Sequence, residues 1–251
     1  MDNSEIKPIS VHYKHTPIPI DMLQMHTHNR HEIYLLLSGT RRYLIRDGIY
    51  DVHAGELVIV PKNELHRTVA QQGSGFERYL VYFSDAETAP VRKAVGDAAF
   101  EALLQSRCIT LSPEHVEQIR QLLKEMEQEN SAEDNCSAAM LSAKLTGLLI
   151  LLLRWGSTRN STPDKSTGRI QKVTQYITEH YAEPLTLHDA ARIAGLEPSY
   201  FCRQFKLYTG VGFSEYLIYV RIKAAEKLLL DTPLPVTQIA ERCHFEQRAV
   251  V

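Results

Sequence analysis

Three histidines and one glutamate near the start of the chain could hold a divalent metal ion. His26 and His28 are two residues apart, so a β-strand would place both imidazoles on the same face. Glu32 follows His28 by four residues, and His66 comes from a later segment. These ligands would leave coordination positions open for a substrate. The same groups could instead line a pocket that hydrogen-bonds a small molecule, or they could simply satisfy one another.

Four polar residues near the other end could contact DNA. Their spacing of i, i+3, i+4 and i+7 places them on one helix face, and they are Ser199, Cys202, Arg203 and Lys206. The guanidinium of Arg203 can bind a guanine edge in the major groove with two hydrogen bonds, whereas the ammonium of Lys206 suits a phosphate. Taken singly, each residue would be read as part of a solvated helix face, so the interpretation depends on the pattern around them.

Short β-rich segments surround the histidines, up to about Ser84. They cover residues 32–37, 43–46, 49–52, 56–60 and 78–83. Between two of these runs, Asp47-Gly48 predicts a tight hairpin in which both turn residues take positive φ. Many short strands separated by regular turns are typical of a β-sandwich or barrel.

The hydrophobic period becomes helical from about Ala89. Ser112-Pro113 is typical of an N-cap followed by the first helical residue, and it predicts a helix over 113–130. A second amphipathic helix is predicted over 137–155. The two helices should pair antiparallel. Their remaining apolar surface would pack either on the barrel or on a second subunit, and periodicity does not separate these alternatives.

Composition bounds the class of protein. The chain has 251 residues, of which 44% are hydrophobic and 23% charged, which excludes a disordered or collagen-like chain. A net charge of -2 does not by itself indicate a nucleic-acid-binding protein. Residues 1–10 have no signal-peptide pattern, and the apolar segment 145–153 is about half as long as a membrane span. We therefore expect a cytoplasmic protein with four reduced cysteines and no membrane partner.

A polar segment separates the two halves. Residues 156–168 are rich in Ser, Thr, Gly and Pro, have no apolar residue and predict a linker. Beyond it, residues 185–207 have the pattern of a helix-turn-helix unit. Thr186 can cap the first helix, Gly195 suits the turn, and Phe201 would bury against the first helix.

With this pattern, residues 169–245 resemble the AraC/XylS family of bacterial transcription regulators. The matching positions include Ala190-Ala191, Ala194-Gly195-Leu196, Ser199-Tyr200-Phe201, Phe205-Lys206, Thr209-Gly210, Arg221-Ile222, Ala224-Ala225 and Ile239-Ala240. The resemblance implies a long helix over 213–230 that joins two helix-turn-helix units. Such a spacer can hold two recognition helices roughly 34 Å apart on double-stranded DNA. The resemblance also implies a small-molecule effector, with a sugar as the expected class.

The second helix-turn-helix unit departs from the family. His244 stands where family members have glycine, and residues 246–251 do not supply a second recognition helix or a basic tail. A shortened chain, a frameshift and a natural short form all fit this observation. We expect the 251-residue chain to bind operator DNA weakly, because half of the base contacts would be missing.

The first half resembles the cupin barrel that AraC-type sensor domains share. The positions that fit the two cupin motifs are His26, His28, Glu32 and Gly39, then Gly55, Pro61 and His66, whereas Asn63 and Ala70 depart from the second motif. The resemblance implies a ligand pocket that functions without metal, so no cofactor is expected. The predicted ligand-binding residues are His26, His28, Glu32, Tyr34 and His66.

Together these observations predict an α+β protein. Its parts are a cupin-like jelly-roll sensor (1–110), a helical hairpin that favours a homodimer (111–155), a linker (156–168) and an AraC-type helix-turn-helix domain, incomplete in its second unit (169–251). The predicted function is ligand-responsive transcription regulation, not catalysis. One alternative is a metal-dependent cupin enzyme, such as a dioxygenase or isomerase. Another is a chain that senses its ligand and dimerises but does not bind an operator.

Overall fold

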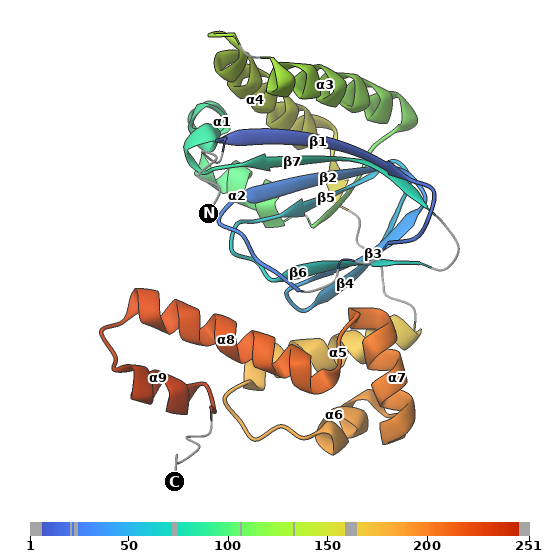
Figure 1. The fold of residues 1–251 in the computed structure, drawn as a ribbon, viewed down its shortest axis with the longest axis vertical. Helices are drawn as coiled ribbons and strands as arrows, with labels where there is room; N and C mark the ends of the chain where they lie inside the picture. Colours follow the sequence, from blue (N-terminus) through green and yellow to red (C-terminus); the bar gives the residue numbers. More distant parts are fainter. Residues whose placement is uncertain are drawn as a thin grey trace.

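Two antiparallel sheets form the first half of the chain (Figure 1). The computed structural model describes residues 7–20, 22, 25–71, 75–105, 107–132, 134–158 and 165–245. The larger sheet has the strand order β1-β7-β2-β5-β8-β9, and the smaller sheet has the order β4-β3-β6. The strands are β1 (Ile9–Thr16), β2 (His31–Ser38), β3 (Thr40–Ile45), β4 (Gly48–His53), β5 (Glu56–Val60), β6 (His66–Ala70), β7 (Phe76–Phe83), β8 (Cys108–Thr110) and β9 (Ser157–Thr158). This barrel and the helical second half confirm the predicted α+β class.

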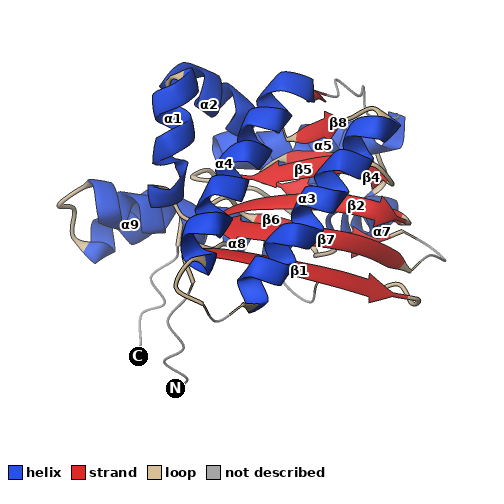
Figure 2. Cartoon of the chain, turned by 90° about the horizontal axis from the view of Figure 1, so that it is seen from above, coloured by secondary structure: helices blue, strands red, loops and turns tan. Residues whose placement is uncertain are grey.

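Helices cover the outer face of the larger sheet (Figures 1 and 2). They are α1 (Ala89–Val95), α2 (Asp97–Gln105), α3 (Pro113–Ser131) and α4 (Ser137–Trp155), and α1 follows the short 3₁₀ helix η1 (Ala86–Thr88). The Ser112 hydroxyl caps α3 by accepting from the His115 backbone N–H, as the Ser-Pro pair predicts. α3 and α4 lie side by side, and their leucines join the outer core of the larger sheet.

α4 is the most apolar helix of the first half. Among the described residues it alone has the length and the mean hydropathy, 1.5, that would suffice to cross a membrane. Leu145, Leu148 and Leu152 are nonetheless buried in the core beneath α3. A core helix of this kind satisfies the same length and hydropathy criteria as a membrane span.

The second half is helical and contains the predicted helix-turn-helix unit. Its helices are α5 (Lys165–His180), α6 (Leu187–Ala194), α7 (Pro198–Thr209), α8 (Phe213–Asp231) and α9 (Val236–Arg242). Thr186 and Asp189 form a reciprocal capping box at the start of α6. Gly195 takes φ +63° and ψ +42°, the left-handed conformation that ends the helix. Phe201 and Phe205 are fully buried beneath α6 and α8.

The hairpin turn differs from the sequence prediction. The loop between β3 and β4 is Arg46-Asp47, because Ile45 and Gly48 form the last residue pair of the ladder. Arg46 takes φ +54°, whereas neither Asp47 nor Gly48 has positive φ. Tertiary contacts determine the turn, since the Arg46 N–H donates to the Leu65 carbonyl at 2.7 Å. The prediction of a two-residue Asp-Gly turn was therefore wrong.

Regular elements occupy both ends of the predicted linker. β9 occupies Ser157–Thr158 and pairs with β8, and α5 begins at Lys165, so 159–164 remain between regular elements and lie outside the described residues. Thr167 is buried, so the polar composition did not exclude helix or burial. Short polar side chains can be buried where the surrounding fold provides packing.

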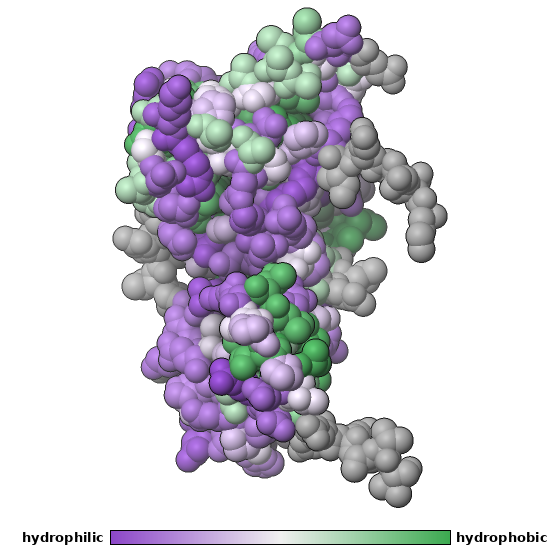
Figure 3. Space-filling view, turned by 90° about the vertical axis from the view of Figure 1, so that its left-hand side faces the viewer, coloured by the Kyte–Doolittle hydropathy of each residue, from purple (hydrophilic) through white to green (hydrophobic). Residues whose placement is uncertain are grey.

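The start of the second helix-turn-helix unit exposes apolar side chains. Leu229 and Leu230 at the end of α8 and Val236 at the start of α9 are exposed, and the space-filling view shows an apolar patch on this side of the second half (Figure 3). His244 takes φ +54°, a conformation that glycine adopts with less strain. The prediction of a missing second recognition helix falls on residues 246–251, which lie outside the described residues.

Candidate ligand cavity and DNA-binding face

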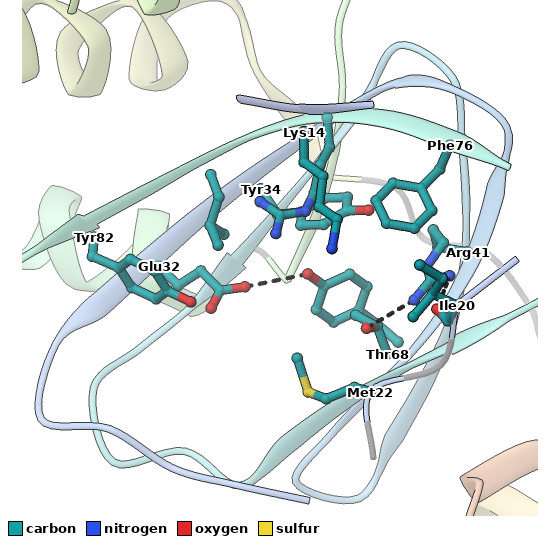
Figure 4. Close-up of a pocket in the computed structure, with 12 residues that line it drawn as sticks. Lys14, Ile20, Met22, Glu32, Tyr34, Arg41, Thr68, Phe76 and Tyr82 are labelled. Atoms are coloured by element: carbon teal, nitrogen blue, oxygen red, sulfur yellow. Dashed lines mark hydrogen bonds between the residues drawn. The ribbon is translucent and has the colours of Figure 1, made fainter. Parts of the chain in front are cut away.

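A solvent-open cavity of about 170 Å³ lies between the two sheets (Figure 4). The residues that line it are Lys14, Ile20, Met22, Glu32, Tyr34, Arg41, Tyr43, Thr68, Phe76, Arg78, Leu80 and Tyr82. Three of these carry positive charge and one carries negative charge.

Glu32 lies between the cavity and the three histidines. Its Oε2 is 3.3 Å from Nε2 of His28 and 3.5 Å from Nε2 of His66, and its Oε1 accepts a hydrogen bond from the Tyr43 hydroxyl at 3.2 Å. The Nδ1 atoms of His28 and His66 lie 2.8 and 2.9 Å from the backbone carbonyls of Arg30 and Glu64. Each imidazole thus donates its Nδ1–H to the backbone and directs Nε2 toward Glu32.

The buried cluster shifts two pKa values in opposite directions. Burial by itself would raise the pKa of Glu32, but the hydrogen bonds and charges of His28 and His66 outweigh it and lower that pKa. Burial by itself would lower the pKa of His66, but the attraction of Glu32 outweighs it and raises that pKa above 6.5. Both shifts favour a Glu32 carboxylate beside a positively charged His66 imidazole.

The same residues have the chemistry of a metal site. The ligand nitrogens of His26, His28 and His66 all lie within 4.8 Å of one another. Tetrahedral ligands about 2.1 Å from a metal lie roughly 3.4 Å apart, close to the distances from Glu32 to His28 and His66. The three histidines and Glu32 fit a divalent cation, which would supply a Lewis acid at the cavity wall.

The structure brings together only part of the predicted pocket. Glu32 and Tyr34 line the cavity, whereas His28 and His66 contact Glu32 on its other side. The rings of His26 and His66 are 4.2 Å apart, so His26 belongs to the same cluster. The predicted residues are therefore neighbours, but the histidines form the wall behind Glu32.

Sequence reasoning missed the cations of the cavity. Arg41 is 3% exposed on β3, and the sequence analysis did not identify it as a pocket residue. Its Nη1 donates to the Ile20 carbonyl at 2.7 Å and its Nη2 to the Thr68 hydroxyl at 3.1 Å. Lys14 on β1 and Arg78 on β7 also line the cavity. Strand alternation was the available signal, but it does not indicate which face is interior.

The predicted DNA-contacting residues lie on one open face of α7. Ser199, Cys202, Arg203 and Lys206 are all exposed, while Phe201 and Phe205 on the opposite side of the helix are buried. The barrel contacts α7 near its end, where the Arg42 guanidinium lies 4.2 Å from the centre of the Tyr208 ring. The candidate recognition face is therefore free of the sensor half among the described residues.

The smaller sheet is shared by the cavity and the helical half. On β3, Arg41 and Tyr43 face the cavity, while Arg42 and Leu44 face the helices. The β3–β4 turn is held from the helical side. Thr174 donates to the Asp47 carbonyl at 2.7 Å, and Tyr216 donates to the Arg46 carbonyl at 2.6 Å.

The helical half also contacts β6 of the smaller sheet, where its backbone comes close to the strand. Gly210 takes φ +77°, and a Cβ there would come within 2.9 Å of both Arg67 and Val69. Met25, Leu44, Ile49 and Leu65 of the barrel share one apolar core with α5 to α8. The two halves are therefore packed together through the outer face of the smaller sheet.

Comparisons with known families agree with this architecture. Residues 20–149 match the family described as the AraC-like ligand binding domain, and residues 190–250 match a helix-turn-helix domain. A sensor barrel followed by such a unit defines a ligand-responsive transcription regulator. Since the first match alone spans more than half of the chain, the protein belongs to the AraC family.

Curated relatives match the chain over most of its length. The chain is 26% identical over 246 residues to the HTH-type transcriptional activator RhaS of Enterobacter sp. (strain 638), covering 92% of this chain and 84% of the relative. It is 26% identical over 227 residues to RhaS of Escherichia coli O139:H28, covering 88% and 78%. These relatives are transcriptional activators, as the regulator hypothesis predicts and the enzyme alternative does not.

Solved structures of ToxT from Vibrio cholerae are also similar over most of the chain. One, in a P21 crystal form, has a TM-score of 0.39 and 12% identity and covers 95% of this chain and 90% of that one. ToxT from Vibrio cholerae O395 has a TM-score of 0.40 and 11% identity and covers 96% and 89%.

The charge balance of the histidine cluster gives a first prediction. With Glu32→Gln, the pKa of His66 should fall below its wild-type value, because burial is no longer offset by a carboxylate. The raised pKa of His66 stabilises the fold below pH 6.5, and this is lost as pH rises through that pKa. The lowered pKa of Glu32 stabilises it above pH 4.5, and this is lost on acidification. The Tm of the wild type should therefore exceed that of Glu32→Gln by the largest margin between pH 4.5 and pH 6.5.

NMR titration of the imidazoles, assigned with His66→Gln, measures the first effect, and thermal unfolding against pH measures the second. Because the His66 imidazole is already paired with the Glu32 carboxylate, we expect protein purified without chelators to carry well below one metal ion per chain. Stoichiometric iron or manganese that disappears in His28→Ala would contradict this expectation and favour the enzyme alternative.

Proposed function

We propose that this protein binds a small molecule in the cavity between its sheets and sequence-specific DNA through the exposed face of α7. In this proposal, residues 1–110 are the sensor, 111–155 the dimerisation hairpin, 156–168 the connection and 169–251 the DNA-binding domain. Arg203 contacts a guanine edge, and Lys206 contacts a phosphate. Ser199 and Cys202 complete the contact surface. As a DNA-binding regulator, the protein would act in the cytoplasm.

The observation that carries this proposal is the shared sheet. Arg41, Tyr43 and Thr68 line the cavity, while the opposite faces of the same strands pack on the DNA-binding half. A ligand that displaces β3 or β6 must also move the turn that Thr174 and Tyr216 hold. The ligand would then favour one arrangement of the two halves over another, because its contacts with the cavity would differ between the two arrangements.

The coupling can be tested with any ligand found by thermal-shift screening. A ligand that raises the Tm should change the affinity for DNA selected in vitro by at least about fivefold, the lower end of ordinary allosteric coupling. The double variant Thr174→Val with Tyr216→Phe should bind the ligand normally and show a smaller change in DNA affinity. Ligand binding that leaves DNA affinity unchanged in the wild type would refute the coupling.

The DNA face gives a separate prediction. Arg203→Ala should weaken binding to selected DNA by about 1–3 kcal/mol, because two hydrogen bonds to one base are lost. Arg203→Lys is the matched variant, since it keeps the charge but not the bidentate geometry. It should lose specific binding and retain non-specific binding. Fluorescence anisotropy with specific and scrambled duplexes measures both, and equal affinity of all three proteins for the specific duplex would exclude Arg203 as a base contact.

We also propose that α4 forms a homodimer contact. The helix is mostly apolar, yet Met140 is 43% exposed and Leu151 is only partly buried. Gly147 lies between them on the same helix face, and an added Cβ there would meet no atom within 4 Å. An apolar surface that remains open within one chain is typical of a protein–protein interface.

The dimer proposal predicts the effect of a buried charge. Leu151→Glu should convert a dimeric mass to a monomeric one at micromolar concentration, because a carboxylate would be desolvated in the interface. Light scattering after gel filtration measures the mass, and circular dichroism confirms that the variant is folded. Lys93→Glu on α1, which also adds a negative charge, should remain dimeric. A wild-type protein that is monomeric under these conditions would refute the proposal.

A further inference from the structure

Two positive charges face each other at the wall of the cavity. Lys14 on β1 is directly opposite Arg78 on β7 in the strand register, and both side chains line the cavity. Like charges directly opposite each other on neighbouring strands are destabilising. Among the residues that the structure describes, neither side chain forms an ion pair with a carboxylate. The sheet therefore holds an uncompensated cationic pair facing the site.

Two buried polar atoms near this pair have no hydrogen-bond partner. They are Nη1 of Arg78 and the hydroxyl oxygen of Tyr34, and the Arg78 guanidinium lies 5.5 Å from the centre of the Tyr34 ring. Tyr34 is only 3% exposed, and burial raises its pKa to about 12, so its hydroxyl remains a neutral donor. Buried donors without partners are uncommon and costly in folded proteins. An acceptor with negative charge would satisfy both groups.

The other side of the cavity has a different chemistry. Lys14 reaches into the space between Glu32 and Arg41, and Glu32 points toward the Tyr43 hydroxyl (Figure 4). Carboxylate oxygens accept hydrogen bonds, so Glu32 suits the hydroxyl groups of a ligand. The cavity thus combines an anion-binding wall with a hydroxyl-binding wall.

We propose that the ligand of this cavity is a small hydroxylated anion, such as a hexuronate or a hexose phosphate, whose acidic group binds Lys14 and Arg78 while its hydroxyls face Glu32. This inference rests on the proposed sensor function and narrows the expected sugar to an acidic one. A carboxylate and a phosphate would use the same cations, so the experiment includes both.

The first test needs no ligand. Lys14→Gln should raise the Tm of the ligand-free protein by about 1–3 °C at low salt, because it removes the opposition of like charges. The gain should shrink in about 1 M NaCl, where screening acts over roughly 3 Å. Lys93→Gln on α1 is the control with the same change of net charge, and its Tm should stay near that of the wild type. A Lys14→Gln protein that is no more stable than this control would overturn the inference.

The second test compares ligands that differ in one group. D-Galacturonate or D-galactose 6-phosphate should raise the Tm of the wild type, whereas D-galactose should not, with sodium chloride equalising ionic strength. Stabilisation by only one acid identifies a carboxylate or a phosphate as the preferred group. Arg78→Gln should lower the affinity for the acidic ligand by roughly 10–100-fold, the usual effect of losing hydrogen bonds to a charged group.

The outcomes separate this inference from the sensor function. If D-galactose stabilises the wild type as well as the acids do, and Arg78→Gln does not change that effect, the cavity binds neutral sugars and the inference fails. The sensor function would then stand. The proposed sensor function fails separately if a ligand that raises the Tm leaves the affinity for DNA unchanged.

Discussion

The smaller sheet has both faces buried, and the rest of the structure depends on this constraint. One face closes the cavity and the other packs on the helical half, so β3 and β6 have no solvent-facing side. Residue alternation then assigns Arg41 and Tyr43 to the ligand side and Arg42 and Leu44 to the helix side. A displacement of these strands cannot remain within one half of the molecule. The sheet therefore connects the cavity physically to the helical half.

Charge is distributed unevenly around the cavity. Glu32 is fully compensated by His28, His66 and the Tyr43 hydroxyl, whereas Lys14 and Arg78 face each other without a carboxylate in the described part of the chain. A buried cluster whose charges are paired stabilises a fold. A cluster of unpaired like charges is typical of a ligand-binding site. This contrast distinguishes the wall behind Glu32, whose charges are paired, from the β1–β7 wall, which we propose binds the acidic group of the ligand.

The family assignment and the geometry agree on regulation. A cupin barrel alone would be compatible with metal-dependent catalysis, and the histidine cluster keeps that chemistry available. Metal-dependent catalysis in a barrel does not require a helix-turn-helix unit. The candidate recognition face of α7 is exposed although the barrel packs on the helical half. In this arrangement the barrel does not act by covering α7. In the function that we propose, it acts through its packing on the helical half, where Arg42 contacts Tyr208 on α7. Thr174 on α5 and Tyr216 on α8 hold the β3–β4 turn.

The sequence by itself determined the local structure. Thr186, Gly195 and Phe201 indicate caps, turn and core within one short segment, and the helices 113–131 and 137–155 follow from their own periodicity. Tertiary structure decided the rest, because strand alternation gives two faces without saying which is interior. The second sheet and the helices turned Arg41 inward, set Lys14 against Arg78 and moved the hairpin turn to Arg46-Asp47. Those contacts join residues far apart in the chain, which no local pattern records.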